Sequence, residues 1–213
     1  MLFGSIRYLN LLPFHVFMQR ALRHNGAKMS FRYKRSVPAA INDAFRKRRI
    51  DAAFISSVAS RRCRCSDVGI VAHAKVYSVL LIPGEAQSDP ASASSNRLAT
   101  VLDLHGRVLI GDEALRHYLD GGEGIDLAEA WYRKTGLPFV FARLCYNRYD
   151  RHVERLARTF ADTPVKLPYY IVKREATKRG ISPKELLWYL EHIHYTIDWK
   201  GKRGLKKFLL SPP

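Results

Sequence analysis

The stretch Val108-Leu109-Ile110-Gly111-Asp112-Glu113-Ala114-Leu115 joins a short apolar run to a polar turn and then to the start of a helix. A second amphipathic helix is expected over 126–136, before the apolar run 139–142. Strands and helices that alternate in this way are typical of α/β proteins, which bind ligands where the carboxyl end of a strand meets a helix. The stretch therefore predicts an α/β fold with a ligand site near Gly111.

The same alternation continues along the rest of the chain. Apolar or alternating runs predict strands over 2–6, 29–33, 50–55, 68–73 and 76–82. Helical spacing predicts helices over 13–22 and 36–48, a short helix around 98–102, and three further helices over 153–160, 168–178 and 183–195. Sheet and helix are thus mixed before residue 142, and the chain is helical after it.

The order of these elements predicts two lobes. The chain is expected to cross between them twice, near Ser78–Ile82 and again near Phe139–Arg143. Lobe one would be discontinuous and comprise residues 1–80 and 143–213, and a smaller lobe two would comprise 81–142. A ligand site between lobes is then expected at the hinge.

Composition and charge limit the class of protein. The 213 residues carry a formal net charge of +17 and a pI near 10.1. The basic residues are scattered, and no RNA-binding or zinc-finger pattern is present, so we expect no nucleic-acid partner. No apolar run is long enough for a membrane helix, and no export signal precedes the first strand, which predicts a cytoplasmic protein without a membrane partner. The positive charge instead favours a small dianionic substrate.

Cysteine and histidine spacing argues against metal and redox chemistry. Cys63, Cys65 and Cys145 lack CxxC spacing and are expected to be reduced thiols. His192 and His194 lie two apart on a predicted helix, where they would point to different faces, so no metal site is predicted. No GxSxG turn, HExxH helix or P-loop occurs, which argues against the corresponding hydrolases and nucleotide-binding proteins.

Small polar residues follow several of the predicted strands. The candidates are Asn10, Ser56 and Ser57, the turn Ser94-Ser95-Asn96, and Gly111-Asp112. If these four strand ends face one cleft, their hydroxyls, amides and backbone N–H groups would bind a small anion. The alternative is that each residue only caps a helix.

Several motifs resemble those of the chorismate dehydratase family, which acts in the futalosine route to menaquinone. Tyr8-Leu9-Asn10-Leu11-Leu12-Pro13 matches the family's YLNxxP opening, and Ser78-Val79-Leu80-Leu81 resembles its SVLL strand. The segment 49–57 ends in the family's ISS, and Ser92-x-Ser94-Ser95 resembles its SxTS with serine in place of threonine. IGDxAL, DLxxxW and TGLPFVFA, at 110–115, 126–131 and 135–142, complete the set. The likeness covers about residues 2–147.

The resemblance implies a two-lobed, periplasmic-binding-protein-like fold of type II with a hinge of two crossing strands. Between Ser78 and Ile110 the chain is shorter than usual family members and lacks a strand and a helix, so the second lobe is expected to be small. No motif beyond Asn147 matches, and nothing is transferred to the basic helices there.

The implied activity is that of a lyase that dehydrates chorismate to 3-[(1-carboxyvinyl)oxy]benzoate without a cofactor or metal. Ser56, Ser57, Ser94, Ser95, Asn96 and Gly111 would bind the substrate, and Asn10 would orient the leaving hydroxyl or the enolpyruvyl group. Asp112 would act either as the base or only as a helix cap. Our hypothesis is that a carboxylate of the substrate itself accepts the proton.

Three alternatives to this activity stay open on the sequence alone. The first is a sister enzyme of the same fold that resembles dihydroxynaphthoate synthase, and the second is a non-catalytic sensor or solute-binding protein for an aromatic carboxylate. The third is a nucleic-acid-binding module, which the scattered charge disfavours. The sequence does not indicate an oligomeric state.

Overall fold

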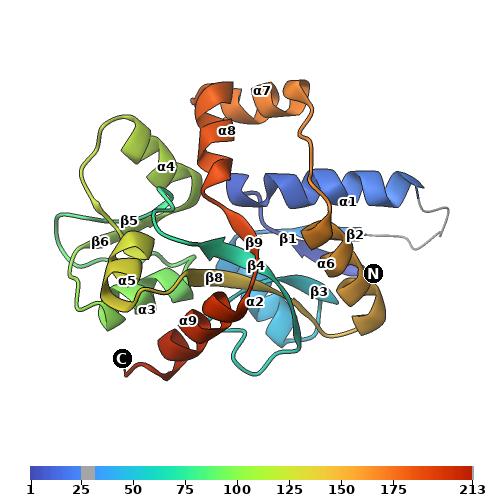
Figure 1. Cartoon of the computed structure of the whole chain (residues 1–213), viewed down its shortest axis with the longest axis horizontal. Coiled ribbons are helices and arrows are strands. Elements are labelled where there is room, and N and C mark those ends of the chain that lie inside the picture. The colour runs from blue at the N-terminus through green and yellow to red at the C-terminus, as the bar shows by residue number, and fades with distance from the viewer. Residues whose placement is uncertain (25–31, 213) are drawn as a thin grey trace.

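Two sheets organise the chain in the computed structural model, which describes residues 1–24 and 32–212 (Figure 1). The larger sheet has six strands in the order β2-β1-β3-β8-β4-β9, and the smaller has three in the order β6-β5-β7. The strands are β1 (Leu2–Ser5), β2 (Arg32–Arg35), β3 (Ala52–Ser56), β4 (Cys65–Ala72), β5 (Val79–Ile82), β6 (Arg107–Ile110), β7 (Ile125–Asp126), β8 (Phe139–Tyr146) and β9 (His194–Thr196). The α/β class and the two-lobed arrangement expected from the sequence are confirmed.

Helices pack around both sheets. In Figure 1, α3, α4 and α5 accompany the smaller sheet on the left, and α1, α2 and α6 accompany the larger sheet on the right. The helices are the short 3-10 helix η1 (Leu9–Leu11), α1 (Leu12–His24), α2 (Pro38–Arg46), α3 (Ala93–Val101), α4 (Gly111–Leu119), α5 (Leu127–Thr135), α6 (Asp150–Asp162), α7 (Tyr169–Thr177), α8 (Pro183–Glu191) and α9 (Trp199–Leu210). No helix among the described residues is long and apolar enough to cross a membrane.

The chain passes from the larger sheet to the smaller sheet once and returns once. It leaves after Ala72 at the end of β4 and returns at Phe139, the first residue of β8, which is the register partner of Ala72. β5 belongs wholly to the smaller sheet, whereas β8 pairs over its full length with β3 and β4. The division of the chain into lobes at residues 80 and 142 stays a prediction.

The C-terminal region differs from the sequence expectation. The helix predicted over 183–195 ends at Glu191, and His194–Thr196 form β9, an edge strand antiparallel to β4. Helix α9 was not predicted; Asp198 caps it by accepting a hydrogen bond from the Gly201 N–H at 2.7 Å. Pairing with a distant strand outweighs local helical spacing here. Of the strand predicted over 29–33, residues 29–31 lie outside the described part of the chain.

The expectation of three reduced cysteines is wrong for two of them. Cys65 and Cys145 form a disulfide, and Cys63 is free. The two bonded residues are register partners on the antiparallel strands β4 and β8, 80 residues apart in the chain. Sequence spacing did not reveal the bond because a sheet register brings the two cysteines together.

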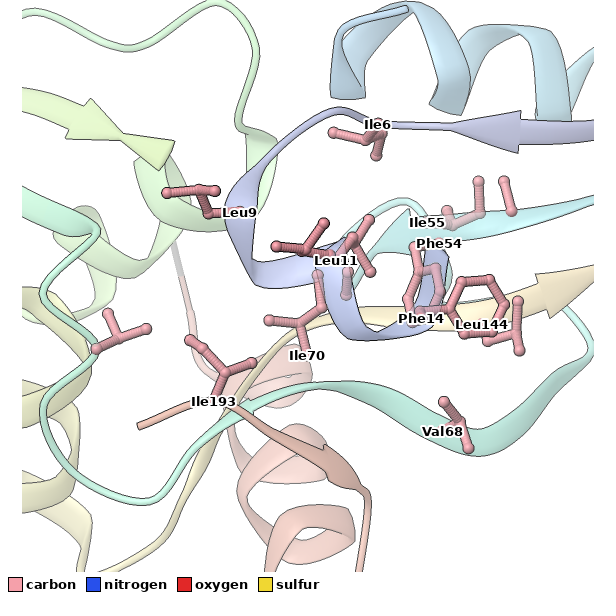
Figure 2. Packing of buried hydrophobic residues seen from close by; sticks show 14 of the residues in the cluster. Ile6, Leu9, Leu11, Phe14, Phe54, Ile55, Val68, Ile70, Leu144 and Ile193 are labelled. Carbon is pink, nitrogen blue, oxygen red and sulfur yellow. The ribbon is translucent and has the colours of Figure 1, made fainter. Parts of the chain in front are cut away.

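The segment that follows β1 is fixed by its apolar residues. Ile6, Leu9 and Leu11 belong to the same cluster of buried hydrophobic residues as Phe54 of β3 and Ile70 of β4, and Figure 2 shows Leu11 beside Phe54 and Ile70. Burying an aliphatic or aromatic side chain contributes about 1.5–3 kcal/mol. The polar residues between these anchors are therefore held in place just after the carboxyl end of β1.

Candidate active site

A cavity of about 70 Å³ lies where the two sheets meet. It brings together four of the residues predicted from the sequence, namely Asn10, Ser56, Ser95 and Gly111. The other lining residues are Ile6, Tyr8, Leu11, Pro38, Phe54, Ile70, Val76, Ser78, Val79, Ala91, Ser92, Ile110, Phe141 and Ala142. Strand ends that are distant in the chain thus meet at one cavity, which has an apolar wall with a few polar groups.

Two predicted serines do not line this cavity. The Ser57 hydroxyl is fully buried and donates a short hydrogen bond to the carbonyl of Val140. Ser94 is also buried, and its hydroxyl accepts a hydrogen bond from the Val58 N–H at 3.3 Å. Ser57 thus joins the end of β3 to β8, and Ser94 joins α3 to the turn after β3, so both hydroxyls are used within the protein.

Asn96 also lies away from the cavity. Its carboxamide oxygen accepts from the Asp89 N–H at 2.9 Å, and its nitrogen donates to the Asp89 carbonyl at 2.7 Å. The side chain thereby closes the loop that leads into α3.

The Asn10 side chain is available to a ligand. Asn10 lies on η1, and its backbone carbonyl accepts a hydrogen bond from the Tyr195 hydroxyl at 2.6 Å. Its side-chain oxygen is buried and has no hydrogen-bond partner among the described residues. A buried polar atom without a partner costs about 1–3 kcal/mol, so this oxygen is an acceptor that a bound molecule or a water in the cavity can satisfy.

The N-terminus of α3 forms a second polar wall. Ser92 caps the helix by accepting a hydrogen bond from the Ser95 N–H at 3.2 Å, and the Ser92 hydroxyl donates to the Ser95 hydroxyl at 2.7 Å. A helix N-terminus carries partial positive charge and favours anions. Ser92 was missed as a site residue, although its position one helical turn ahead of Ser95 is the signal of an N-cap.

Ser78 is another lining residue that the sequence did not single out. Its hydroxyl accepts a hydrogen bond from the Tyr189 hydroxyl at 2.9 Å, and its carbonyl accepts from the Gly111 N–H at 2.8 Å. Tyr189 belongs to α8 and is fully buried, and burial raises its pKa well above the usual range. The C-terminal region, in which no motif could be matched, therefore supports both Ser78 and Asn10.

Gly111 is required by close packing against Tyr8. Its φ is +68°, a backbone conformation that favours glycine, and a Cβ built there would lie 2.8 Å from the Tyr8 ring. Burial, followed by the nearby Asp89, Asp112 and Glu113 carboxylates, raises the pKa of Tyr8 to about 12. The Tyr8 hydroxyl therefore stays protonated at neutral pH.

The cavity has polar groups but no charged side chains. None of its lining residues is Arg, Lys, Asp or Glu, and apolar side chains such as Phe54, Ile70 and Phe141 form much of the wall. Such a surface suits an apolar ring whose acid groups are bound by hydroxyls and helix N-termini.

Asp112 does not line the cavity, and both of its carboxylate oxygens are bonded elsewhere. One oxygen accepts a hydrogen bond from the Leu9 N–H at 2.9 Å, and the other accepts from Arg179 Nε at 2.6 Å. Arg179 also donates to Glu175 at 2.8 Å and to the Arg7 carbonyl at 2.8 Å. We call Asp112 and Arg179 the latch, because together they join the segment after β1 to α4 and to the end of α7.

Histidines do not assemble a metal centre in the part of the chain that the structure describes. No group of three or more His, Cys, Asp or Glu residues there could hold a metal ion. The predicted helical relation of His192 and His194 is wrong, because His194 lies on β9, with its ring 4.2 Å from that of His73.

The two sheets, with a cavity between them, have the fold that solved solute-binding proteins share. The periplasmic aliphatic sulphonate binding protein from Escherichia coli is similar over 100% of this chain and 94% of its own, with a TM-score of 0.58 and 12% identity. A protein from Archaeoglobus fulgidus is similar over 97% of this chain and 94% of its own, with a TM-score of 0.66 and 13% identity. At these identities the likeness shows the fold alone.

The chain belongs to the menaquinone biosynthesis family, whose profile matches residues 1–102 and 88–210. A protein named chorismate dehydratase from Campylobacter jejuni is 42% identical over 214 residues, which cover 98% of this chain and 96% of that protein. A protein of the same name from Thermus thermophilus is 25% identical over 258 residues, which cover 96% and 92% respectively. The resemblance identified from the motifs is confirmed, and the length of the second alignment means that the Thermus protein has residues this 213-residue chain lacks.

Proposed function

We propose that this chain is a hydro-lyase that converts chorismate to 3-[(1-carboxyvinyl)oxy]benzoate and water in menaquinone biosynthesis. The 42% identity to the Campylobacter chorismate dehydratase supports the reaction. The observation that carries the proposal in the structure is the unpartnered Asn10 oxygen at the wall of an uncharged, partly apolar cavity.

Chorismate has an apolar ring and two carboxylates, and the cavity offers complementary groups. The N-terminus of α3, with Ser92 and Ser95, would bind one carboxylate. The Ser56 hydroxyl on β3, with the first-turn N–H groups of α4 that follow Gly111, would bind the other, since the Gly111 N–H itself donates to Ser78. Asn10 would hydrogen-bond the ring hydroxyl and orient it for departure. Positioning and electrostatic stabilisation then supply the rate enhancement.

The elimination needs a proton acceptor. The C–H bond at the ether-bearing ring carbon breaks, its electrons form a ring double bond, and the neighbouring C–O bond breaks so that proton and hydroxide leave as water. No lining side chain is a carboxylate or histidine, and the Asp112 oxygens are engaged by Leu9 and Arg179. These contacts favour a carboxylate of the substrate as the acceptor.

Substrate entry requires the cavity to widen. Its volume of about 70 Å³ is below the ~300–1,000 Å³ of pockets that enclose small molecules. The wall is shared between strands of both sheets, so we infer that the sheets separate to admit chorismate and close around it.

The direct test is incubation of the protein with chorismate. We expect the diene absorbance to disappear and an aromatic product lighter by one water to form, identified by mass and by its aromatic proton signals. Binding without loss of absorbance would instead indicate a sensor or solute-binding protein. Loss of absorbance with a different product would overturn the proposed reaction.

Two adjacent serines provide a matched test of the substrate site. Ser56 lines the cavity, and its hydroxyl accepts a hydrogen bond from Asn42 Nδ2 at 3.0 Å, which leaves its own proton available for donation. The Ser57 hydroxyl instead donates to the Val140 carbonyl and does not line the cavity. We expect Ser56→Ala to lower kcat/KM by about tenfold, the value of one hydrogen bond to the substrate. It should lower the free energy of unfolding by no more than about 1 kcal/mol, because the Asn42 amide that loses its acceptor is partly exposed to water. Ser57→Ala should lower the free energy of unfolding by about 1–2 kcal/mol and leave kcat/KM nearly unchanged. Steady-state kinetics and urea unfolding measure both, and the reverse pattern would contradict this assignment.

A further inference from the structure

A second and larger cavity lies beyond the carboxyl ends of the parallel strands β1 and β2. It has a volume of about 360 Å³ and lies between α1 and α7, with α7 above α1 in Figure 1. Its lining residues are Ser5, Arg7, Tyr8, Leu9, Leu12, His15, Val16, Gln19, Tyr33, Arg35, Ile171, Arg174, Glu175, Lys178 and Arg179. We call it the cationic cavity.

The charge of this cavity is not balanced. Five of its lining residues are Arg or Lys and one is Glu. Glu175 is shared by Arg174, Lys178 and Arg179 at 2.8–3.3 Å. Arg7 and Arg35 line this space from the ends of β1 and β2, are exposed to solvent, and form no ion pair among the described residues. Two guanidinium groups are thus free to bind an anion.

The cavity also has an apolar floor. Leu12 and Val16 on α1 and Ile171 on α7 are buried side chains that reach its surface, and the half-buried Tyr33 ring stands beside Arg35. A simple inorganic anion would leave this floor exposed to water. A ring that carries an acid group would cover the floor and reach both arginines.

The cationic cavity is chemically distinct from the candidate active site. The active-site cavity has no charged lining residue, and the two share only Tyr8 in their linings. Arg179 belongs to the cationic cavity and is bonded both to Asp112 and to the Arg7 carbonyl. The Tyr8 ring, packed against Gly111, thus forms a wall between the two spaces.

We propose that the cationic cavity is a second ligand site that binds a ring-bearing carboxylate through Arg7 and Arg35. This inference does not depend on the proposed dehydratase activity, because it rests on the lining of a separate cavity. Its ligand is recognised by two free guanidinium groups above an apolar floor.

Binding of benzene-1,3-dicarboxylate, measured by calorimetry, tests the proposal. We expect saturable binding that is weakened at least about tenfold in the double variant Arg7→Gln/Arg35→Gln, because two charge-assisted contacts are lost. The control Lys34→Gln/Lys173→Gln removes the same charge from residues outside the cavity lining and should leave the affinity within about twofold.

His15 supplies an independent readout at the same cavity. Its ring is bonded to the Ile6 carbonyl at 2.9 Å. Burial lowers the pKa of His15, the Ile6 carbonyl and Glu175 raise it, and the positive charges of Arg35 and Arg7 lower it. An anion on these arginines offsets their repulsion of the imidazolium, so the pKa of His15 should rise when the probe binds. Proton NMR titration of the histidine signals measures the shift.

Three outcomes would overturn the proposal. The first is no saturable binding at probe concentrations up to about 10 mM. The second is an affinity that is lost in Asn10→Ala but kept in Arg7→Gln/Arg35→Gln, which would place the probe in the active-site cavity. The third is inorganic phosphate binding as tightly as the dicarboxylate, which would remove the role of the apolar floor. Loss of turnover with chorismate affects none of these results.

Discussion

Replacing Asn10 with alanine should lower kcat/KM for chorismate by about 100- to 1,000-fold, the largest effect we expect of any single substitution. The Asn10 side-chain oxygen is buried at the cavity wall without a partner among the described residues, and we propose that it interacts with the substrate. The side-chain oxygen can accept a hydrogen bond from the bound hydroxyl, and the amide Nδ2 can donate to the hydroxyl oxygen. If the donated bond strengthens as negative charge develops on the leaving oxygen, kcat falls more than KM rises. Steady-state kinetics with chorismate separate the two constants.

Asn96→Ala is the matched control for this substitution. The Asn96 amide is bonded to the backbone of Asp89 and lies outside the active-site lining. Its loss should lower the free energy of unfolding by about 1–2 kcal/mol and change kcat/KM by no more than about threefold. An Asn10→Ala protein that is folded, as judged by circular dichroism, and still turns over at the rate of the unaltered chain would remove Asn10 from the mechanism.

Removing the Asp112–Arg179 ion pair of the latch should lower both the free energy of unfolding and kcat/KM. We expect Asp112→Asn and Arg179→Gln each to lower the free energy of unfolding by about 2 kcal/mol, because each removes a largely buried, charge-assisted hydrogen bond. The Leu9 N–H also depends on the Asp112 carboxylate, so the segment that carries Asn10 loses a fixed contact. We expect kcat/KM to fall by about tenfold through looser positioning.

The double variant separates positioning from proton transfer. Asp112→Asn/Arg179→Gln should cost less than the sum of the two single substitutions, because both remove the same ion pair. Turnover should persist in Asp112→Asn, since the substrate carboxylate is the proposed acceptor. If instead chorismate still binds to Asp112→Asn but no product forms, Asp112 is the base and the substrate-assisted mechanism is wrong.

The sequence predicted the strand ends that meet at the active-site cavity but not which side chain of each pair points into it. Ser56 and Ser57 are neighbours at the end of β3, where successive side chains point to opposite sides of a strand. Ser94 and Ser95 are neighbours on α3, where one residue turns the side chain by more than a quarter of a turn. The spacing of a motif does not say which of two neighbouring side chains points into the cavity until the local strand or helix geometry is known.

Long-range pairing accounts for most of what the sequence did not reveal. The Cys65–Cys145 disulfide depends on the β4–β8 register, and β9 exists because it pairs with β4. Tyr189 and Tyr195 come from a region without a recognisable motif, yet their hydroxyls support Ser78 and the Asn10 backbone. A tyrosine on a helix or an edge strand gives no local sign of the distant acceptor that it meets.

The pairing of Ala72 with Phe139 has a consequence for how this protein family tolerates changes in length. The segment between Ala72 and Phe139 forms the smaller sheet, and its two end residues are partners in the β4–β8 pairing of the larger sheet. The β4–β8 pairing therefore keeps the two ends of this segment together whatever lies between them. A strand or helix can be gained or lost within the segment while the hydrogen bonds of the larger sheet stay the same. The smaller sheet can therefore change in size while the larger sheet keeps its register, and the 258-residue alignment with the Thermus protein shows that relatives of this chain do differ in length.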